Sequence, residues 1–536
     1  MAQPAPADLS PRQEQRMIRH LAALALLIAP VAAGAQTVRW GNNGEISTMD
    51  PHGAFSTANA AVLGNIYETL IRLDRDLKFE PGLATGWEVL APDHYRFAIR
   101  QGVRFHDGTP MTAGDVVASL RRASVPNSPY ASVTHMIREV TQSGEWSVDV
   151  LLRGAYPVLI NDLAGISILS EAWMTRNDAL LPADPARGRT AYTSMNTNGT
   201  GPFRLVSRTV DSATVMERFP EWWDRATHNI QRVEFRPVAN DATRVAGLIA
   251  GQLDVITPTP LQDLDRFRST PAIRVIEAQD LRVQFFGFNV APGHAVEGQP
   301  RNPLADVRVR EALTRAVDIQ AITTSVMRNL TRPIHTLIAQ EIGGYDASLA
   351  GPRVAHDPAR ARQLLAEAGY PDGFQIGMDC PNDRFVNGER VCRAVASMWA
   401  RIGVRVNLNI MRYPAYTARF LNQQSDIFFL GWANTPQLDG FSILNNMLHT
   451  KTQRRGSWNA GAVSDARFDA LVEGISTEMD PARRTALMTE AFQMERNNFW
   501  TVPLYREPMV LAMRRQLEMP ASADGRMRFW LARWSE

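Results

Sequence analysis

The chain contains 536 residues, which is too long for one ordinary domain and enough for about two to four compact units. Hydrophobic residues make up 45% and charged residues 21%, as in a globular protein with a buried core. The 57 basic and 55 acidic residues leave a net charge of only +2, which excludes a strongly basic nucleic-acid-binding class, so we expect no nucleic-acid partner.

The N-terminal segment has the pattern of a secretory signal peptide. Basic residues precede the nine-residue apolar run 21–29, and Ala33-Gly34-Ala35 places small residues where a signal peptidase cleaves. The apolar run is far shorter than the roughly 20 residues that span a bilayer. We therefore predict a signal peptide at 1–35 and a mature chain that starts at Gln36.

Export of the chain implies a periplasmic protein. Either Met1 or Met17 could be the translation start, since a compact signal with a basic beginning follows Met17. No Cys lies near the cleavage site, so we do not expect a lipid anchor.

The first part of the mature chain is predicted to be rich in strands. Short runs of alternating apolar and polar residues indicate strands, and Thr112 is a typical N-cap in front of a helical segment. In chain order we expect a strand at 38–40, a loop at 45–51, a helix at 58–70, strands at 87–89 and 95–100, a turn at 105–110 and a helix at 113–123.

The glycine-rich segment 199–203 interrupts this part of the chain. It is not a dinucleotide-binding fingerprint, because Pro202 lacks a backbone donor and Arg204 stands at the third glycine position. After it we expect a strand at 204–208, a helix at 242–250, and strands at 253–256 and 283–290.

The later part of the chain alternates helices and strands. We expect helices at 306–327, at 358–368 behind the N-cap Asp357, and at 388–401, with strands at 374–378, 405–410 and 426–430. Such βαβ alternation predicts a mainly parallel sheet covered by helices. Ligand sites lie outside the carboxyl ends of such strands, and the segment 431–440 is such a place.

The two cysteines, Cys380 and Cys392, have two interpretations. An oxidising compartment favours a disulfide between them, while a pair of free buried thiols is the alternative. A zinc site is not expected, because two Cys twelve positions apart lack the spacing of a closed tetrahedral site. We expect no metal and no cofactor.

Familiar catalytic patterns are missing from the sequence. There is no GxSxG elbow, P-loop, HExxH or EF-hand loop, and His106-Asp107 fits a turn better than a catalytic dyad. The protein is therefore not expected to be an enzyme, although a secreted hydrolase is kept as an alternative.

Several segments together resemble the family-5 extracellular solute-binding proteins, the dipeptide, oligopeptide and nickel-chelate binding group of ABC importers. They are 67–70, 81–84 with Trp87, 97–108, 199–203, 306–313 and 361–370, and their order extends over residues 38–510. The resemblance implies an α/β, two-lobe clam-shell fold of periplasmic binding proteins with an additional inserted domain, mixed sheets and two hinge crossings.

The resemblance also implies domain bounds. Lobe I is expected to combine 37–55, 196–280 and 490–536, the inserted domain to take 56–195, and lobe III, the second ligand-binding lobe, to take 281–489. The hinge crossings are expected near 285–290 and 496–502.

Ligand-binding residues follow from the same resemblance. Dipeptide binders carry an acid three positions after the Trp that is Trp432 here, yet Thr435 stands at that position, and Asp439 could substitute or be a surface turn. Arg384 is expected to hold a carboxylate, with pairing to Asp383 or Asp379 as the alternative. The other expected ligand-binding residues are Glu45, Ser47 and Thr48 in the opposite lobe, Trp432 as an apolar wall, and Asn434.

The function expected from the resemblance is capture of a peptide or peptide-like solute for an ABC importer. The partners would be that solute and inner-membrane permease subunits with their cytoplasmic ATPases, and the protein would act as a monomer. A metal chelate, an opine or an oligosaccharide is the alternative solute.

Overall fold

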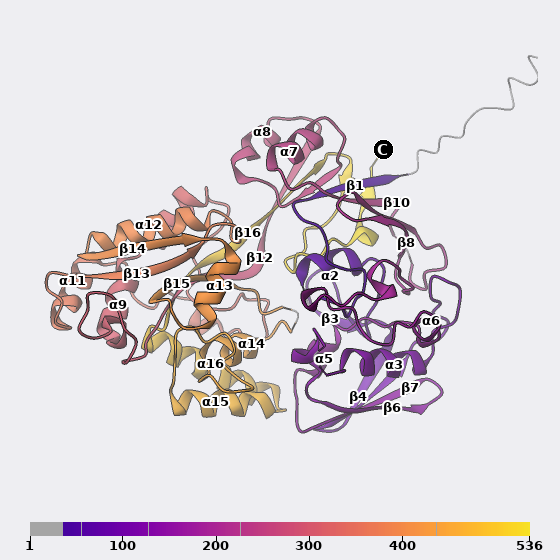
Figure 1. Ribbon diagram of the computed structural model, residues 1–536, viewed down its shortest axis with the longest axis horizontal. Helices are drawn as coiled ribbons and strands as arrows, with labels where there is room; N and C mark the ends of the chain where they lie inside the picture. The colour runs from indigo at the N-terminus through magenta and orange to yellow at the C-terminus, as the bar shows by residue number, and fades with distance from the viewer. Residues whose placement is uncertain (1–35, 55, 127, 226, 436, 536) are drawn as a thin grey trace, which may run out of the picture.

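The computed structural model describes residues 36–535 apart from residues 55, 127, 226 and 436. The signal peptide predicted at 1–35 lies outside these described residues. The chain forms two lobes that stand side by side in Figure 1, connected by the long strands β12 (Ile273–Phe288) and β16 (Thr501–Arg514). This is the expected two-lobe α/β fold with two crossings between the lobes.

One mixed sheet of ten strands passes through both lobes, in the order β14-β13-β15-β12-β16-β11-β1-β10-β9-β8. At one end β13 is parallel to β14 and β15, and at the other end β1 is parallel to β10 and β11. The central pair, β12 and β16, is antiparallel. The two lobes therefore share a continuous hydrogen-bonded ladder at the place where they join.

The first lobe contains both ends of the described chain and a core of its own around Val38, Trp40 and Phe235. Its elements, besides its halves of β12 and β16, are β1 (Thr37–Asn42), α2 (Thr57–Leu63), α6 (Glu171–Arg176), β8 (Phe203–Thr209), β9 (Ala213–Arg218), β10 (Arg232–Pro237), α7 (Asp241–Ile249), β11 (Val255–Thr257), α8 (Leu264–Arg268), β17 (Leu517–Glu518) and β18 (Arg533–Trp534).

The inserted domain has a separate four-stranded sheet in the order β4-β5-β7-β6. Its elements are β2 (Ile71–Leu73), β3 (Phe79–Pro81), β4 (Ala84–Ala91), β5 (His94–Ile99), α3 (Ala113–Ala123), α4 (Ala131–Thr134), β6 (Ile137–Gly144), β7 (Ser147–Leu152) and α5 (Leu159–Leu163). Its core extends from Leu70 to Ile168, a narrower span than the expected 56–195. The flanking helices α2 and α6 bury their apolar faces in the first lobe's core instead.

The second lobe has the expected alternation of strands and helices. Its elements are α9 (Val307–Ala316), α10 (Ile319–Ala321), α11 (Pro358–Glu367), β13 (Phe374–Pro381), α12 (Gly388–Ala400), β14 (Val404–Met411), α13 (Tyr413–Leu421), β15 (Ile427–Trp432), α14 (Phe441–Ile443), α15 (Ala466–Thr477) and α16 (Pro481–Asn498). The structure joins Cys380 at the end of β13 to Cys392 in α12 by a disulfide.

The predicted single helix at 306–327 is interrupted. Val317 is extended (φ −87°, ψ 114°), and the Asp318 side chain accepts a hydrogen bond from the backbone N–H of Ala321, which caps a new helical segment. Aspartate caps helices in this way and so competes with continuation of the preceding helix.

The two crossing strands are hydrogen-bonded to each other where they pass between the lobes. The β12–β16 register shifts between Gln279 and Val283, and beyond Val283 the strand also pairs with β15 of the second lobe. Residues 490–505, expected in lobe I, belong to the second lobe, because α16 and the start of β16 bury Phe492, Trp500 and Leu504 in its core. The expected boundary at 490 would have divided a helix.

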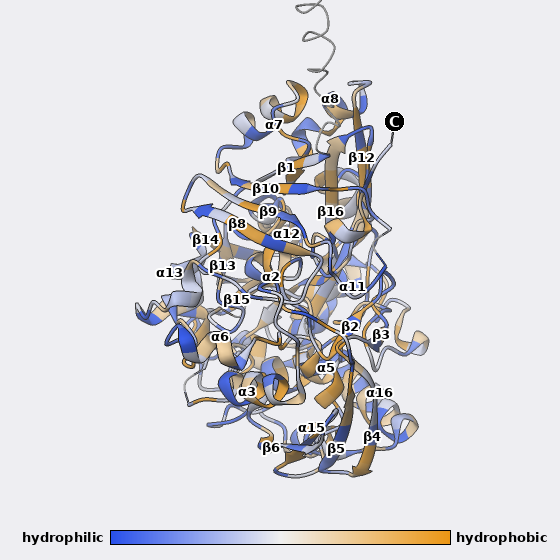
Figure 2. Cartoon of the chain, turned by 90° about the vertical axis from the view of Figure 1, so that its right-hand side faces the viewer, coloured by the Kyte–Doolittle hydropathy of each residue, from blue (hydrophilic) through white to orange (hydrophobic). Residues whose placement is uncertain are grey.

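Figure 2 shows that helices such as α3 and α16 carry both hydrophilic and hydrophobic segments, as expected for helices with one exposed face and one buried face. Among the described residues, no helix is both long and apolar enough to cross a membrane.

Candidate functional site: a pocket between the lobes

A pocket of about 440 Å³ lies between the two lobes, within the size range of small-molecule sites. The first lobe and its insertion contribute residues that include Ser56, Ala60, Leu73, Tyr130, Asp524 and Arg526. The second lobe contributes Arg282 from β12, Arg384, Tyr413, Trp458 and the segment that follows β15. The pocket therefore lies at the carboxyl end of β15, the place predicted for a ligand.

Trp432 and Trp458 form the apolar side of the pocket. Their ring centroids are 5.8 Å apart in an edge-to-face arrangement, and the Trp432 indole N–H donates to Ser442 Oγ at 3.3 Å. Trp432 was expected as an apolar wall, whereas Trp458, 26 positions further along the chain, had no signal that linked it to the site.

Asn434 and Thr435 both line the pocket. Asn434 is only 1% exposed, and neither its amide oxygen nor its amide nitrogen has a hydrogen-bond partner in the described part of the chain. Its φ of 54° is one that Asn tolerates better than most residues. Because buried polar groups are nearly always hydrogen-bonded, this amide is suited to bind a polar solute.

Arg384 lies in the loop between β13 and α12 and lines the pocket. Its guanidinium carbon is 5.3 Å from the ring centre of Phe385 and 5.8 Å from that of Tyr413, and within the described residues it has no ion pair. The two acids that were the alternative partners of Arg384 form ion pairs with other arginines. Asp383 pairs with Arg412 at 3.2 Å, and Asp379 pairs with Arg419 at 2.9 Å.

Charged groups of both signs lie near Arg384, namely Arg282, Glu507 and Asp280. Burial and the nearby charge of Arg282 lower the pKa of the Arg384 guanidinium. Arg282 is itself paired with Glu507 at 3.1 Å and donates to the Gly431 carbonyl oxygen at 3.2 Å. Burial raises the pKa values of the Glu507 and Asp280 carboxyls, whereas the nearby charges of Arg282 and Arg384 lower both.

Three expected residues of the opposite lobe are not among the residues that line the pocket. The Glu45 carboxylate accepts from the Asp211 backbone N–H at 2.8 Å, and Ser47 Oγ donates to Asn59 at 3.1 Å. Thr48 is fully buried and its hydroxyl oxygen accepts from the Asp50 N–H. All three make hydrogen bonds to residues that do not line this pocket, whereas Arg526 of the first lobe does line it.

Asp439 is not among the residues that line the pocket, although its neighbour Leu438 is. It is 5% exposed, and both of its carboxylate oxygens accept from the guanidinium of Arg484, at 2.7 and 2.9 Å. With Thr435 in the position where dipeptide binders carry an acid, the only carboxylate among the described lining residues is that of Asp524.

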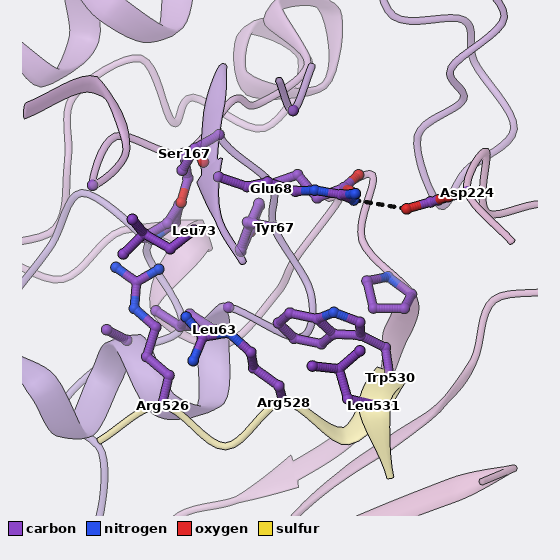
Figure 3. Close-up of a pocket in the computed structure, with 18 of the residues that line it drawn as sticks. Leu63, Tyr67, Glu68, Leu73, Ser167, Asp224, Arg526, Arg528, Trp530 and Leu531 are labelled. Atoms are coloured by element: carbon purple, nitrogen blue, oxygen red, sulfur yellow. Dashed lines mark hydrogen bonds and ion pairs between the residues drawn. The ribbon is translucent and has the colours of Figure 1, made fainter. Parts of the chain in front are cut away.

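A second pocket of about 360 Å³ adjoins the first on the side of lobe I, and both are lined by Ala60, Leu73, Tyr130 and Arg526. Figure 3 shows this second pocket, with Arg526 and Arg528 extending into it from the C-terminal segment beside Trp530. Residues from this segment were missed, because nothing in the sequence near 526 distinguishes a pocket arginine from a structural one.

Contacts between the lobes border the first pocket. Gln437, in the loop after β15, donates from its side chain to Asp162 of α5 at 2.9 Å, and its carbonyl oxygen accepts from Asn161. Burial raises the pKa of the Asp162 carboxyl to about 7. The lobes are thus held together in this structure by polar contacts beside the pocket.

Two lobes joined by a pair of crossing strands, with a polar pocket between them, define a protein that binds small solutes. The sequence model of the bacterial extracellular solute-binding proteins, family 5 middle region, matches residues 78–454, well over half of the chain. The chain belongs to this family and is the solute-binding protein of an ABC importer.

Known relatives are similar to this chain over almost its whole length. The glutathione-binding protein GsiB of Salmonella paratyphi A is 25% identical over 504 residues, which cover 91% of this chain and 92% of that protein. The structure of HbpA2 from Haemophilus parasuis is similar with a TM-score of 0.78 at 23% identity, over 93% of this chain and 100% of that chain. A dipeptide-binding protein from Pseudoalteromonas sp. SM9913 in complex with Met-Leu is similar with a TM-score of 0.75 at 20% identity, over 93% and 100% of the two chains.

Proposed function

We propose that the protein captures an acidic, peptide-like solute between its lobes and presents it to the membrane subunits of the importer. The observation that carries this proposal is Arg384, a pocket guanidinium without an ion-pair partner in the described residues. A guanidinium can hold a carboxylate through two parallel hydrogen bonds. The unpartnered amide of Asn434 adds a donor and an acceptor of the kind that a peptide group needs.

The relatives support a peptide-like solute, since one is named for glutathione and another was solved with Met-Leu. A neutral oligosaccharide would leave Arg384 without a counter-charge, so the pocket favours an acid. Among the described lining residues the one carboxylate, that of Asp524, is already paired with Arg528. These residues therefore offer no free carboxylate to the ammonium group that a free dipeptide carries.

The remaining parts of the proposal rest on family membership and on the N-terminal sequence pattern. The partners are inner-membrane permease subunits with their cytoplasmic ATPases, and the protein acts as a monomer in the periplasm, cleaved before Gln36 and without a lipid anchor. It releases its solute unchanged and is not an enzyme. N-terminal sequencing of the exported protein tests the cleavage site.

The proposal is tested by identifying the solute. Protein purified from native periplasm is denatured, the released small molecules are identified by mass spectrometry, and the main one is titrated calorimetrically into three proteins: the wild type, Arg384→Gln and Arg412→Gln. Loss of a buried charged hydrogen bond costs about 2 to 5 kcal/mol, or roughly 30-fold to several-thousand-fold in affinity.

We expect such a loss for Arg384→Gln. Arg412, whose side chain is 84% exposed, is the matched control and should change affinity by less than about threefold. A solute without an acid group, or full affinity in Arg384→Gln, would contradict the proposal.

A further inference from the structure

The pocket between the lobes contains a second arginine with incomplete charge compensation, Arg526, and this one belongs to lobe I. Its Nε lies 3.6 Å from Asp524 Oδ2, beyond direct hydrogen-bond distance. Both oxygens of Asp524 are taken by Arg528 instead, at 2.9 and 2.8 Å. Arg526 makes no other ion pair within the described residues.

Charges around Asp524 leave an excess of one positive charge. Burial alone would raise the pKa of the Asp524 carboxyl. The charges of Arg528 and Arg526 lower it to about 2, so this group stays ionised. Burial and the adjacent Arg528 lower the pKa of the Arg526 guanidinium, and the charge of Asp524 opposes them without reversing the shift. One carboxylate therefore faces two guanidinium groups, and it is committed to Arg528.

The residues that line the whole pocket also carry an excess of positive charge. Among the charged side chains that line it, Arg282 is paired with Glu507 and Asp524 with Arg528. Within the described residues Arg384 has no ion pair, and Arg526 has only the 3.6 Å contact with the Asp524 carboxylate that Arg528 already engages. One belongs to the second lobe and the other to the first. A ligand with a single acid group can compensate only one of them.

Arg526 also has a position suited to ligand contact. It lines both the pocket between the lobes and the adjoining pocket, and in Figure 3 its side chain reaches toward Leu73, which lines both pockets as well. An anionic group at this boundary would meet the guanidinium while the rest of the ligand stays between the lobes.

We propose that the solute carries two separated anionic oxygen groups, one bound by Arg384 of the second lobe and the other by Arg526 of the first. This inference rests on the proposed function and narrows its ligand class to acids with negative charge at both ends. Such a dianion interacts with both lobes at once, so it favours the closed arrangement more than a monoanion does. Either carboxylate or phosphonate oxygens would meet the requirement.

The test uses four defined probes with the intact mature protein. Acetyl-Ala-Ala carries one carboxylate, succinyl-Ala-Ala carries a carboxylate at each end, and phosphonoacetyl-Ala-Ala replaces one of these by a phosphonate. Free Ala-Ala carries an ammonium group at the N-terminal end, where the other probes carry an acyl group. Affinities are measured by calorimetry for the wild type, Arg526→Gln, Arg526→Lys and Arg266→Gln. Arg266 is exposed and away from both pockets, so its variant removes the same charge as a control.

We expect wild-type protein to bind succinyl-Ala-Ala at least tenfold more tightly than acetyl-Ala-Ala, with Ala-Ala weakest. Arg526→Gln should abolish this preference and leave acetyl-Ala-Ala affinity within about threefold, while Arg526→Lys keeps part of the preference and Arg266→Gln keeps all of it. If the wild type binds phosphonoacetyl-Ala-Ala more tightly than succinyl-Ala-Ala, the anionic group at Arg526 is phosphate-like. If it binds succinyl-Ala-Ala more tightly, that group is a carboxylate.

Two outcomes would overturn the inference in distinguishable ways. Equal affinities of wild-type protein for the acetyl and succinyl peptides, or a preference that survives in folded Arg526→Gln, would reject the second anion site alone. Failure of wild-type protein to bind any of the probes would reject capture of peptide-like acids, and with it both proposals. Thermal melting of each variant shows whether it is folded before affinities are compared.

Discussion

Asp439 and Arg484 form a buried bidentate ion pair behind the loop that follows β15, with oxygen–nitrogen distances of 2.7 and 2.9 Å. Asp439 Oδ1 also accepts from the backbone N–H of Phe441 at 2.9 Å, which begins α14. The pair therefore holds the pocket loop in place from behind.

Replacement of Asp439 by Ala should act on stability. It leaves the Arg484 guanidinium buried without a counter-ion, with only the Ile475 carbonyl oxygen as an acceptor at 3.1 Å, and such a change costs about 3 to 5 kcal/mol. We expect that loss in the free energy of unfolding, measured by denaturant titration, with solute affinity of the folded protein within about threefold. Asp383→Ala, which breaks a more exposed pair, should cost about 0 to 1 kcal/mol. A stable Asp439→Ala protein with strongly reduced affinity would instead place Asp439 at a ligand ammonium.

Cys380 and Cys392 should not react with alkylating reagents in exported protein, because they form a disulfide. Both sulfur-bearing residues are fully buried, and the bridge closes a loop with a sequence separation of 12. In the chain-entropy model a loop of this size contributes about 3 kcal/mol. We expect no added mass after iodoacetamide treatment without reductant, and a lower melting temperature for the double Cys→Ala variant. Two alkylated thiols in native protein would contradict the pairing.

The carboxyl group of Glu68 should make stability depend on pH. It accepts from Thr200 Oγ at 2.8 Å and from the indole N–H groups of Trp222 and Trp223, and burial raises its pKa from 4.5 to about 7. Between these pH values the unfolded chain has lost the proton that the folded chain still holds. The stabilising contribution of the Glu68 carboxyl is therefore fully present below about pH 4.5 and is lost as the pH rises to about 7.

A Glu68→Gln variant isolates this effect, because the amide keeps an acceptor for the indoles but does not titrate. Relative to the variant, the wild type should lose on the order of 1 to 3 kcal/mol of unfolding free energy between pH 4.5 and 7. Denaturant titrations of both proteins at several pH values provide the measurement. Parallel pH profiles for the two proteins would show that Glu68 is ionised in the folded state throughout.

The side chain of Gln437 should contribute to closure of the lobes. Its hydrogen bond to Asp162 joins the second lobe to the insertion, and such a bond contributes about 0.5 to 3 kcal/mol. We expect Gln437→Ala to weaken solute binding by roughly threefold to tenfold, mainly through faster release, as measured by stopped-flow fluorescence of the pocket tryptophans. Gln142→Ala, an exposed position in the insertion, is the control. An unchanged release rate would show that this contact does not hold the closed state.

Local signals predicted much of the fold. Thr112 was expected to cap a helix at 113–123, and the structure shows α3 there with a reciprocal capping box between Thr112 and Asp115. The parallel strands around β13 also follow from the alternation of apolar runs and helical segments. These features depend on residues that are close in sequence, so their physical causes can be read there.

The missed features depend on partners far away in the chain. The first half of β12 carries Glu277, Gln279 and Asp280, so it does not look like a strand, yet the ladder with β16 stabilises it. In the same way, Arg384 and Arg526 are 142 positions apart, and only the fold brings both to one pocket. Arg384 was expected through family resemblance, whereas Arg526 required the structure.

We propose above that this protein closes around an acidic solute through Arg384 without altering it. The most direct measurement is small-angle X-ray scattering of wild-type and Arg384→Gln protein, with and without the solute recovered from native protein, followed by mass spectrometry of that solute. The account predicts a smaller radius of gyration on addition of solute to the wild type, no change for the variant at the same concentration, and a solute recovered intact. An unchanged radius for saturated wild-type protein, equal compaction of the variant, or conversion of the solute would contradict it.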